Sequence, residues 1–191
     1  MPELTAADVS AFTNDRLPDD GGEGETTRML NAALTAARNY CGWHVSPIIE
    51  DAELILDGPG GGILDLPTRN LLDISELTEN DTAVEVKWSK TGAVRKASRS
   101  CWTCEYQAIA VTITHGFTED EAADWRQAIL AMVVSISRTA SDDAEPAGPL
   151  VTKKIDDVEY QWADYSNAAQ HAVYEVAAVL DRYRRDFVVF A

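Results

Sequence analysis

The stretch VTITHGFTEDEAADWRQAILAMVVSI, from Val111 to Ile136, decides the fold class because the spacing of its apolar residues changes part-way along it. Up to His115, apolar and polar residues alternate, as they do in a strand with one buried face. Thr118 and Glu121 then have the spacing of a helix capping box. The apolar residues that follow recur every three or four positions: Trp125, Ile129, Met132 and Ile136. A strand that leads into an amphipathic helix, ending near Ala140, predicts an α+β fold.

Residues 45–116 hold short segments rich in Ile, Val, Leu and Thr, separated by turn-forming sequences such as DGPGGG at Asp57–Gly62. We expect these segments to form a meandering antiparallel unit of five or six strands, inserted between helices. The helix before this unit should run from about Thr26 to Tyr40, with Thr26 as its N-cap and Gly42 just past its end.

The sequence after Ala140 predicts a short β-hairpin within residues 150–163 and then a last helix. This helix should begin near Asn167 and end at the basic pair Arg184-Arg185, whose charges suit a helix C-terminus. The fold is then a small bundle of three to four helices, with an inserted antiparallel β unit and a hairpin before the C-terminal helix. We expect the following divisions: an N-terminal arm and linker at 1–24 (with a short possible helix at 6–12), one domain at 25–191, its helical core at 25–44 and 117–185, the β insertion at 45–116, and a C-terminal tail at 186–191.

The chain is strongly acidic: its 191 residues include 32 Asp and Glu but 16 Lys and Arg, a net charge of -16 at pH 7. Such a chain offers no basic face to a phosphate backbone or to an anionic membrane, so tight binding to either is disfavoured. The acidity fits two interpretations, a role in solubility and a surface that faces DNA without adhering to it. We find no secretory signal or membrane-spanning run, and three cysteines are too few for a disulfide scaffold, so we expect reduced thiols.

Two short motifs, CGWH and CWTC, supply three thiols and an imidazole with zinc-like local gaps. Cys41, His44, Cys101 and Cys104 could form a structural metal site in a small zinc-stabilised binding or regulatory protein. The context favours another interpretation, because Cys41 falls on the apolar face of a helix and CWTC runs into a strand-like segment. We therefore expect no metal and keep the zinc protein as the alternative.

The sequence contains no motif that we can assign to an active site, so we expect neither catalysis nor a cofactor. DGPGGG joins two strand segments and lacks the Lys-Ser/Thr of a phosphate-binding loop. His115 is compatible with a catalytic base, but a hydrogen-bonded structural histidine at a strand–helix junction fits better. The acidic group Asp156, Asp157 and Glu159 fits a solvated hairpin tip better than a cation site.

The segment DFVVFA at Asp186–Ala191 places four large apolar side chains beyond the last helix: Phe187, Val188, Val189 and Phe190. Burying them would contribute on the order of several kcal/mol. The segment can fold back on its own core, or it can add to a neighbouring subunit as a strand or in a pocket.

Four stretches in order resemble the head–tail connector proteins of long-tailed bacteriophages, also called head completion or adaptor proteins, with the actinobacteriophage branch most similar. They are ARNYCGWHVSP at Ala37–Pro47, LDGPGGGILDLPT at Leu56–Thr68, VTITHGFTED at Val111–Asp120 and VTKKIDDVEYQWAD at Val151–Asp164, and LDRYRR at Leu180–Arg185 also fits. The resemblance implies that Trp43 of the CGWH motif anchors the core. CWTC is not a family feature, and the hairpin lacks the turn glycine usual in the family.

The resemblance implies a structural virion protein and not an enzyme. Such proteins assemble as a ring, commonly of twelve subunits, which extends the DNA channel beneath the portal and offers a platform to the next protein. The implied partners are the portal protein, the next connector or tail terminator protein, other copies of the chain, and double-stranded DNA that passes through without sequence-specific binding during ejection. The implied locations are the head–tail interface of the virion and, during assembly, the host cytoplasm, without membrane contact.

Two sets of candidate site residues follow from the hairpin, the tail and this resemblance. Candidates for contacts with a neighbouring subunit or the portal are Lys153, Ile155, Val158, Tyr160, Trp162, Phe187, Val188, Val189 and Phe190. Candidates for acids that face the channel are Asp156, Asp157 and Glu159. Carboxylates along a channel would repel the duplex and so limit its adhesion.

Overall fold

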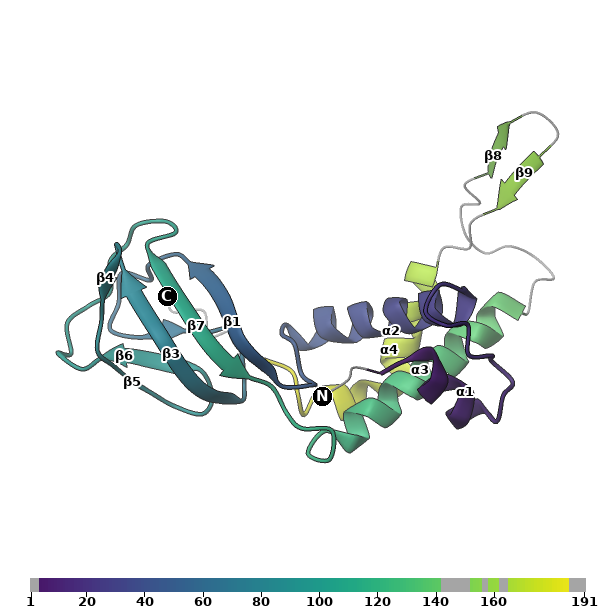
Figure 1. Ribbon diagram of the computed structural model, residues 1–191, viewed down its shortest axis with the longest axis horizontal. Coiled ribbons are helices and arrows are strands. Elements are labelled where there is room, and N and C mark those ends of the chain that lie inside the picture. Colours follow the sequence, from purple (N-terminus) through teal and green to yellow (C-terminus); the bar gives the residue numbers. More distant parts are fainter. Residues whose placement is uncertain (1–3, 142–151, 156–157, 162–164, 186–191) are drawn as a thin grey trace. The chain divides into compact units, whose positions relative to one another are not determined.

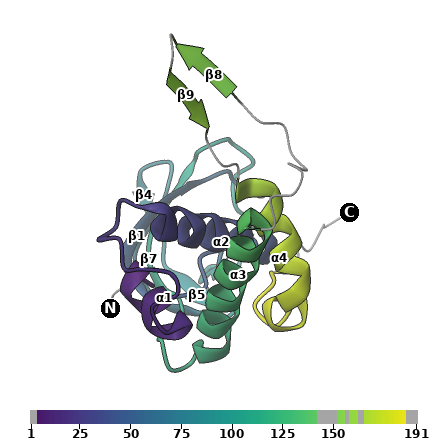
Figure 2. The same ribbon diagram turned by 90° about the vertical axis from the view of Figure 1, so that its right-hand side faces the viewer.

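The structure is a computed structural model that describes residues 4–141, 152–155, 158–161 and 165–185. These residues form four helices and three antiparallel sheets, which is the α+β fold predicted from the sequence. The chain divides into two compact units, most of whose elements are labelled in Figures 1 and 2. We call them the helical unit, Pro2–Cys41 with Ala123–Arg184, and the β unit, Gly42–Ala122 with Arg185–Ala191.

Four helices build the helical unit: α1 at Ala6–Thr13, α2 at Glu25–Cys41, α3 at Ala123–Ser141 and α4 at Tyr165–Leu180. α3 packs on α2 and α4, α2 also contacts α4, and α1 lies against α2 and α3 (Figure 2). The predicted apolar face of α3 is confirmed, since all four of its members are buried: Trp125, Ile129, Met132 and Ile136. Within the described part of the chain, no helix is both long enough and apolar enough to span a bilayer.

The N-terminal residues, expected as an arm, contribute to the core of the helical unit. α1 begins with a capping box formed by Thr5 and Asp8, and this region buries Leu4, Ala6 and Val9. The prediction that Thr26 caps α2 is wrong, because Thr26 lies inside the helix and is buried. The carboxylate of Asp20 accepts hydrogen bonds from the hydroxyl and the backbone N–H of Thr27 instead, and these bonds lower the pKa of Asp20 to about 2.

The last two helices are shorter than the sequence predicts. The capping box of Thr118 and Glu121 forms, with hydrogen bonds of 3.0 and 3.2 Å between backbone N–H groups and side-chain oxygens, but it closes a turn before α3 begins at Ala123. α4 ends at Leu180, before the predicted Arg184-Arg185, because the chain enters a series of turns there.

Seven strands build the β unit in two antiparallel sheets. The first sheet has the order β1-β7-β3-β4, with β1 at Ile49–Leu56, β7 at Ile109–His115, β3 at Leu71–Glu79 and β4 at Thr82–Ala83. The second has the order β2-β6-β5, with β2 at Leu64–Asp65, β6 at Ala93–Lys96 and β5 at Val86–Trp88. The expected meander of five or six strands is wrong, because β7 pairs with both β1 and β3 and so lies between strands that precede it (Figure 1).

The two sheets of the β unit share one hydrophobic core. The register places Leu54, Val111 and Leu77 side by side on the inner face of the first sheet. The second sheet contributes the register partners Leu64 and Val94 to the same core. Since successive side chains of a strand point to opposite faces, the residues between these positions point outward.

A third, two-stranded sheet precedes α4. β8 at Thr152–Ile155 pairs with β9 at Val158–Gln161, which confirms the predicted hairpin.

Candidate assembly surfaces

The four candidate zinc ligands do not come together as a site. Among the residues that the structure describes, no three His, Cys, Asp or Glu side chains are grouped so that they could hold a metal ion. Cys41 is buried on α2, and this burial raises the pKa of its thiol to about 11. His44 bonds through Nε2 to a main-chain carbonyl oxygen at 2.7 Å, while Cys101 and Cys104 are exposed. The zinc-protein alternative therefore has no assembled ligand set.

The CWTC segment pairs with the glycine-rich connection between β1 and β2. Three main-chain hydrogen bonds of 2.8 Å join residues 58–61 to residues 102–105. Gly58 permits this approach, because a Cβ at that position would lie 2.2 Å from the carbonyl oxygen of Thr103. The interpretation of DGPGGG as a connection between two strands is confirmed.

A buried lysine, which the sequence analysis missed, holds the same CWTC segment from the other side. Lys96 of β6 is 8% exposed, and its ammonium group contacts the carboxylate of Glu79. It also donates to the carbonyl oxygen of Cys101 at 2.9 Å and lies 4.9 Å from the centre of the Trp102 ring. Glu79 in turn accepts a hydrogen bond of 2.7 Å from the N–H of Thr103. The one signal in the sequence for this burial is the alternation of inward and outward side chains along β6, which places Lys96 on the same inward face as Val94.

The pKa of Glu79 reflects this setting. Burial alone would raise its pKa, but the hydrogen bonds from Lys96 and Thr103 outweigh burial and lower the pKa below its ordinary value. The carboxylate of Glu79 therefore stays ionised and keeps its contacts with Lys96 and the N–H of Thr103.

His115 ends β7 in a buried group of aromatic rings. Its ring lies 6.4 Å from that of Trp43, which is itself buried, and 6.1 Å from that of His44. Burial, and secondarily the charge of His44, lower the pKa of His115 to about 4, so it is neutral at pH 7. Nδ1 of His115 has no hydrogen-bond partner among the described residues. The buried Asn70 bonds the same junction, since its side-chain amide donates to the carbonyl oxygen of Gly116 at 2.7 Å.

A polar cluster fixes the end of α4 within the helical unit. Asp124 of α3 accepts hydrogen bonds from the guanidinium group of Arg182, at 2.8 Å, and from the hydroxyl of Tyr183. Burial and the contact with Asp124 raise the pKa of Tyr183 far above its ordinary value. The hydroxyl of Tyr40 on α2 donates to Asp181 at 2.6 Å. The chain that leaves α4 is thus tied to both neighbouring helices.

The predicted contact residues fall in the hairpin and in the tail. Within the β unit, Arg185 pairs with Asp65 of β2 at 2.5 Å, so the chain is anchored immediately before the tail. The register of the hairpin pairs Lys153 with Tyr160 and Ile155 with Val158, and it pairs Glu159 with Lys154. Asp156, Asp157, Trp162, Phe187, Val188, Val189 and Phe190 lie outside the described residues. The roles of both sets stay predictions.

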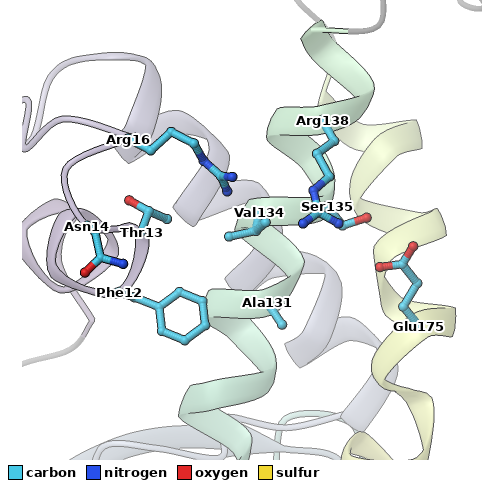
Figure 3. A pocket seen from close by; sticks show the side chains of 9 residues that line it. All are labelled: Phe12, Thr13, Asn14, Arg16, Ala131, Val134, Ser135, Arg138 and Glu175. Carbon is cyan, nitrogen blue, oxygen red and sulfur yellow. The ribbon is translucent and has the colours of Figure 1, made fainter.

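Two surface depressions lie on the helical unit. The smaller, of about 450 Å³, is lined by Phe12, Arg16, Arg138 and Glu175 among others, and Figure 3 shows both arginine side chains extending toward it. The larger, of about 610 Å³, lies between α2 and α4, beside the exposed ring of Tyr174. Neither depression is lined by a histidine or a cysteine.

No protein-family model and no curated protein matches the sequence. Solved structures match at the level of fold, among them the following two. One is the neck of a native gene transfer agent (GTA) particle, computed with C12 symmetry, with a TM-score of 0.59 and 12% identity over 100% of this chain and 96% of that chain. This chain has the fold of a neck protein. The other is the neck of an empty GTA particle, computed with C6 symmetry, with a TM-score of 0.62 and 15% identity over 98% of this chain and 92% of that chain.

The likeness runs through both units and is a likeness of fold. The two matches give no support to the finer expectation that the chain is most similar to the actinobacteriophage branch. At 12% and 15% identity, they assign no role to an individual residue.

Proposed function

We propose that the protein is a structural subunit of the neck that joins head and tail in a phage-like particle, where it forms a ring beneath the portal. The observation that carries this proposal is the match to two neck structures over nearly the full length of both chains. Those necks are symmetric assemblies, which supports a ring built from copies of one chain.

The charge of the chain suits a ring that DNA passes through. A net charge of -16 on 191 residues repels a duplex, so DNA would slide past such a ring without the counterion release that drives adhesion. In this proposal Asp156, Asp157 and Glu159 of the hairpin face the channel.

The hairpin and the tail are the parts that we assign to contacts with the portal or with the next subunit. The hairpin precedes α4 in the chain, and the tail follows the anchored residue Arg185. Four apolar side chains in the tail, Phe187 to Phe190, would gain from burial in a partner's groove.

Native mass spectrometry tests the proposal. The purified chain is measured alone and after mixing with the portal ring of the same particle. We expect a metal-free subunit that adds to the portal as one ring-sized set. A chain that carries one zinc ion per copy and does not bind the portal would overturn the proposal. It would favour the alternative, a small zinc-stabilised binding or regulatory protein.

Two variants test the assignments within this proposal. Deletion of 187–191 should abolish addition to the portal while the circular dichroism of the subunit is unchanged. Tyr106→Ser is the matched control, because it removes an aromatic ring that is 86% exposed elsewhere on the β unit, and it should bind normally. Portal binding by the truncated chain would show that the tail is not the contact. Charge reversal of Asp156, Asp157 and Glu159 should slow DNA ejection, and an unchanged ejection rate would remove these acids from the channel.

A further inference from the structure

The outer face of the second sheet of the β unit carries two positive charges side by side. Lys87 of β5 and Arg95 of β6 are direct register partners, and both are exposed. Like charges placed opposite each other destabilise a sheet. Neither side chain forms an ion pair within the described part of the chain, although the protein has twice as many acidic as basic residues. We call this pair the basic face.

The outer face of the first sheet carries the opposite charge. Glu53 of β1 and Glu76 of β3 are both register partners of Thr112 on the central strand β7, so they flank it on the same face. Asp73 of β3 lies opposite Thr114, two residues further along β7. These three carboxylates are exposed and have no ion-pair partner among the described residues. We call Glu53, Asp73 and Glu76 the acidic face.

The acidic face also includes an apolar patch. Ile55 of β1 is 70% exposed, and its register partner on β7 is the exposed Ala110. Apolar side chains bordered by charges are the usual composition of a protein–protein contact, with a dry centre and a polar rim. A surface that only repelled DNA would have no use for an exposed isoleucine beside its carboxylates.

The two faces lie on opposite sides of the β unit. Residues that alternate with them, Leu54 and Val111 in the first sheet and Val94 in the second, enter one shared core, so the outward residues of the two sheets point away from each other. In a cyclic ring each copy offers two different surfaces, one to each neighbour. With the twelvefold symmetry of one matching neck, neighbouring copies differ by only one twelfth of a turn, so these two surfaces must be nearly opposite.

We propose that the acidic face of one copy docks on the basic face of the next, and that this charge-complementary contact between β units closes the ring. The inference rests on the proposed function, since it names the surfaces by which the ring subunits meet. Its occupant is a second copy of this chain, because opposite charges on opposite faces make the chain complementary to itself in a head-to-tail sense.

Paired charge reversals test this contact. The first variant, Lys87→Glu with Arg95→Glu, makes both faces acidic; the second, Glu53→Lys with Glu76→Lys, makes both basic. Each variant alone should assemble on the portal about tenfold less than the natural chain or worse, because like charges then meet at every interface. An equal mixture should assemble again, as a ring of even number in which the two variants alternate, and native mass spectrometry reads this composition directly.

The outcomes separate the inference from the function on which it rests. If the natural chain does not assemble on the portal, the proposed function fails. If the natural chain assembles and both variants do so equally well, the inference fails and the function stands. Loss of assembly without rescue in the mixture also overturns the inference, because it would show that these faces meet the portal, DNA or another protein.

Two controls complete the design. Arg16→Glu with Arg28→Glu makes the same change of net charge as the first variant, on exposed residues of the helical unit, and should leave assembly unchanged. Circular dichroism of each variant checks that the exposed substitutions leave the subunit folded. Rings of the natural chain should also dissociate as salt rises, since exposed ion pairs are screened, and the salt sensitivity should return in the mixed ring.

Discussion

Replacing Lys96 with methionine should release the CWTC segment of the β unit. Methionine keeps the aliphatic stem over the Trp102 ring but removes the ammonium group, and with it the contact to Glu79 and the 2.9 Å hydrogen bond to the carbonyl oxygen of Cys101. Removing one partner of a buried ion pair costs about 3–5 kcal/mol, because the other charge is left without compensation. Glu79 keeps its hydrogen bond from Thr103 and is 16% exposed, so we expect a loss near the lower end, about 3 kcal/mol.

Urea denaturation followed by tryptophan fluorescence measures this loss, and hydrogen exchange at the Thr103 amide locates it. The double variant Lys96→Met with Glu79→Gln is the control, because its neutral amide oxygen still accepts from Thr103 but leaves no buried charge. It should be more stable than Lys96→Met alone. The natural chain should also lose this contribution as the pH falls below about 4.5, since the lowered pKa of Glu79 stabilises the fold only where the unfolded carboxyl is ionised. A Lys96→Met cost below about 1 kcal/mol, or a double variant less stable than the single one, would refute the reasoning.

Three further predictions follow from the β unit. His115 has a folded pKa of about 4, below its unfolded value, so the natural chain should lose about 3 kcal/mol between pH 6.5 and 4 in acid denaturation, and His115→Gln should lose correspondingly less over that window. Gly58→Ala should destabilise the fold by about 1–3 kcal/mol, because the new Cβ meets a main-chain oxygen, whereas Gly61→Ala has open space and should be near neutral in thermal unfolding. Lys87→Glu should raise the free energy of unfolding by about 0.2–1 kcal/mol, because it turns a like-charge pair with Arg95 into an ion pair; unchanged or lower stability would contradict the pairing.

The local elements were predictable because their signals lie close together in the sequence. The apolar spacing from Trp125 to Ile136 identified α3 and its buried face. Gly42 follows the end of α2 with a φ of 76°, the left-handed conformation that favours glycine after a helix. The hairpin before α4 was recognisable from two short extended segments around an acidic turn.

The features that depend on distant partners were not predictable in this way. The pairing of β7 with both β1 and β3 is a choice among sheet orders that strand patterns do not distinguish. Thr26 has the side chain of a helix cap, but Asp20 occupies that role by folding back from the preceding loop. The charge of Lys96 predicts an exposed side chain, and its burial depends on partners that the sequence does not reveal, chiefly the carboxylate of Glu79.

The acidic and basic faces illustrate the same limit. Each charge is unremarkable in the sequence, and it is the register that sets Lys87 beside Arg95 and Glu53 across from Glu76. A surface of this kind becomes visible only when strand pairing is known.

The placement of the three thiols makes the natural chain ready for site-selective labelling. Cys41 is enclosed in the helical unit with a pKa of about 11, so it holds almost no thiolate at neutral pH, and alkylating reagents require the thiolate. Cys101 and Cys104 lie exposed on the β unit. A maleimide dye should therefore mark the β unit alone, without mutagenesis, and its fluorescence would follow ring closure from within the unit that we assign to the contact between copies.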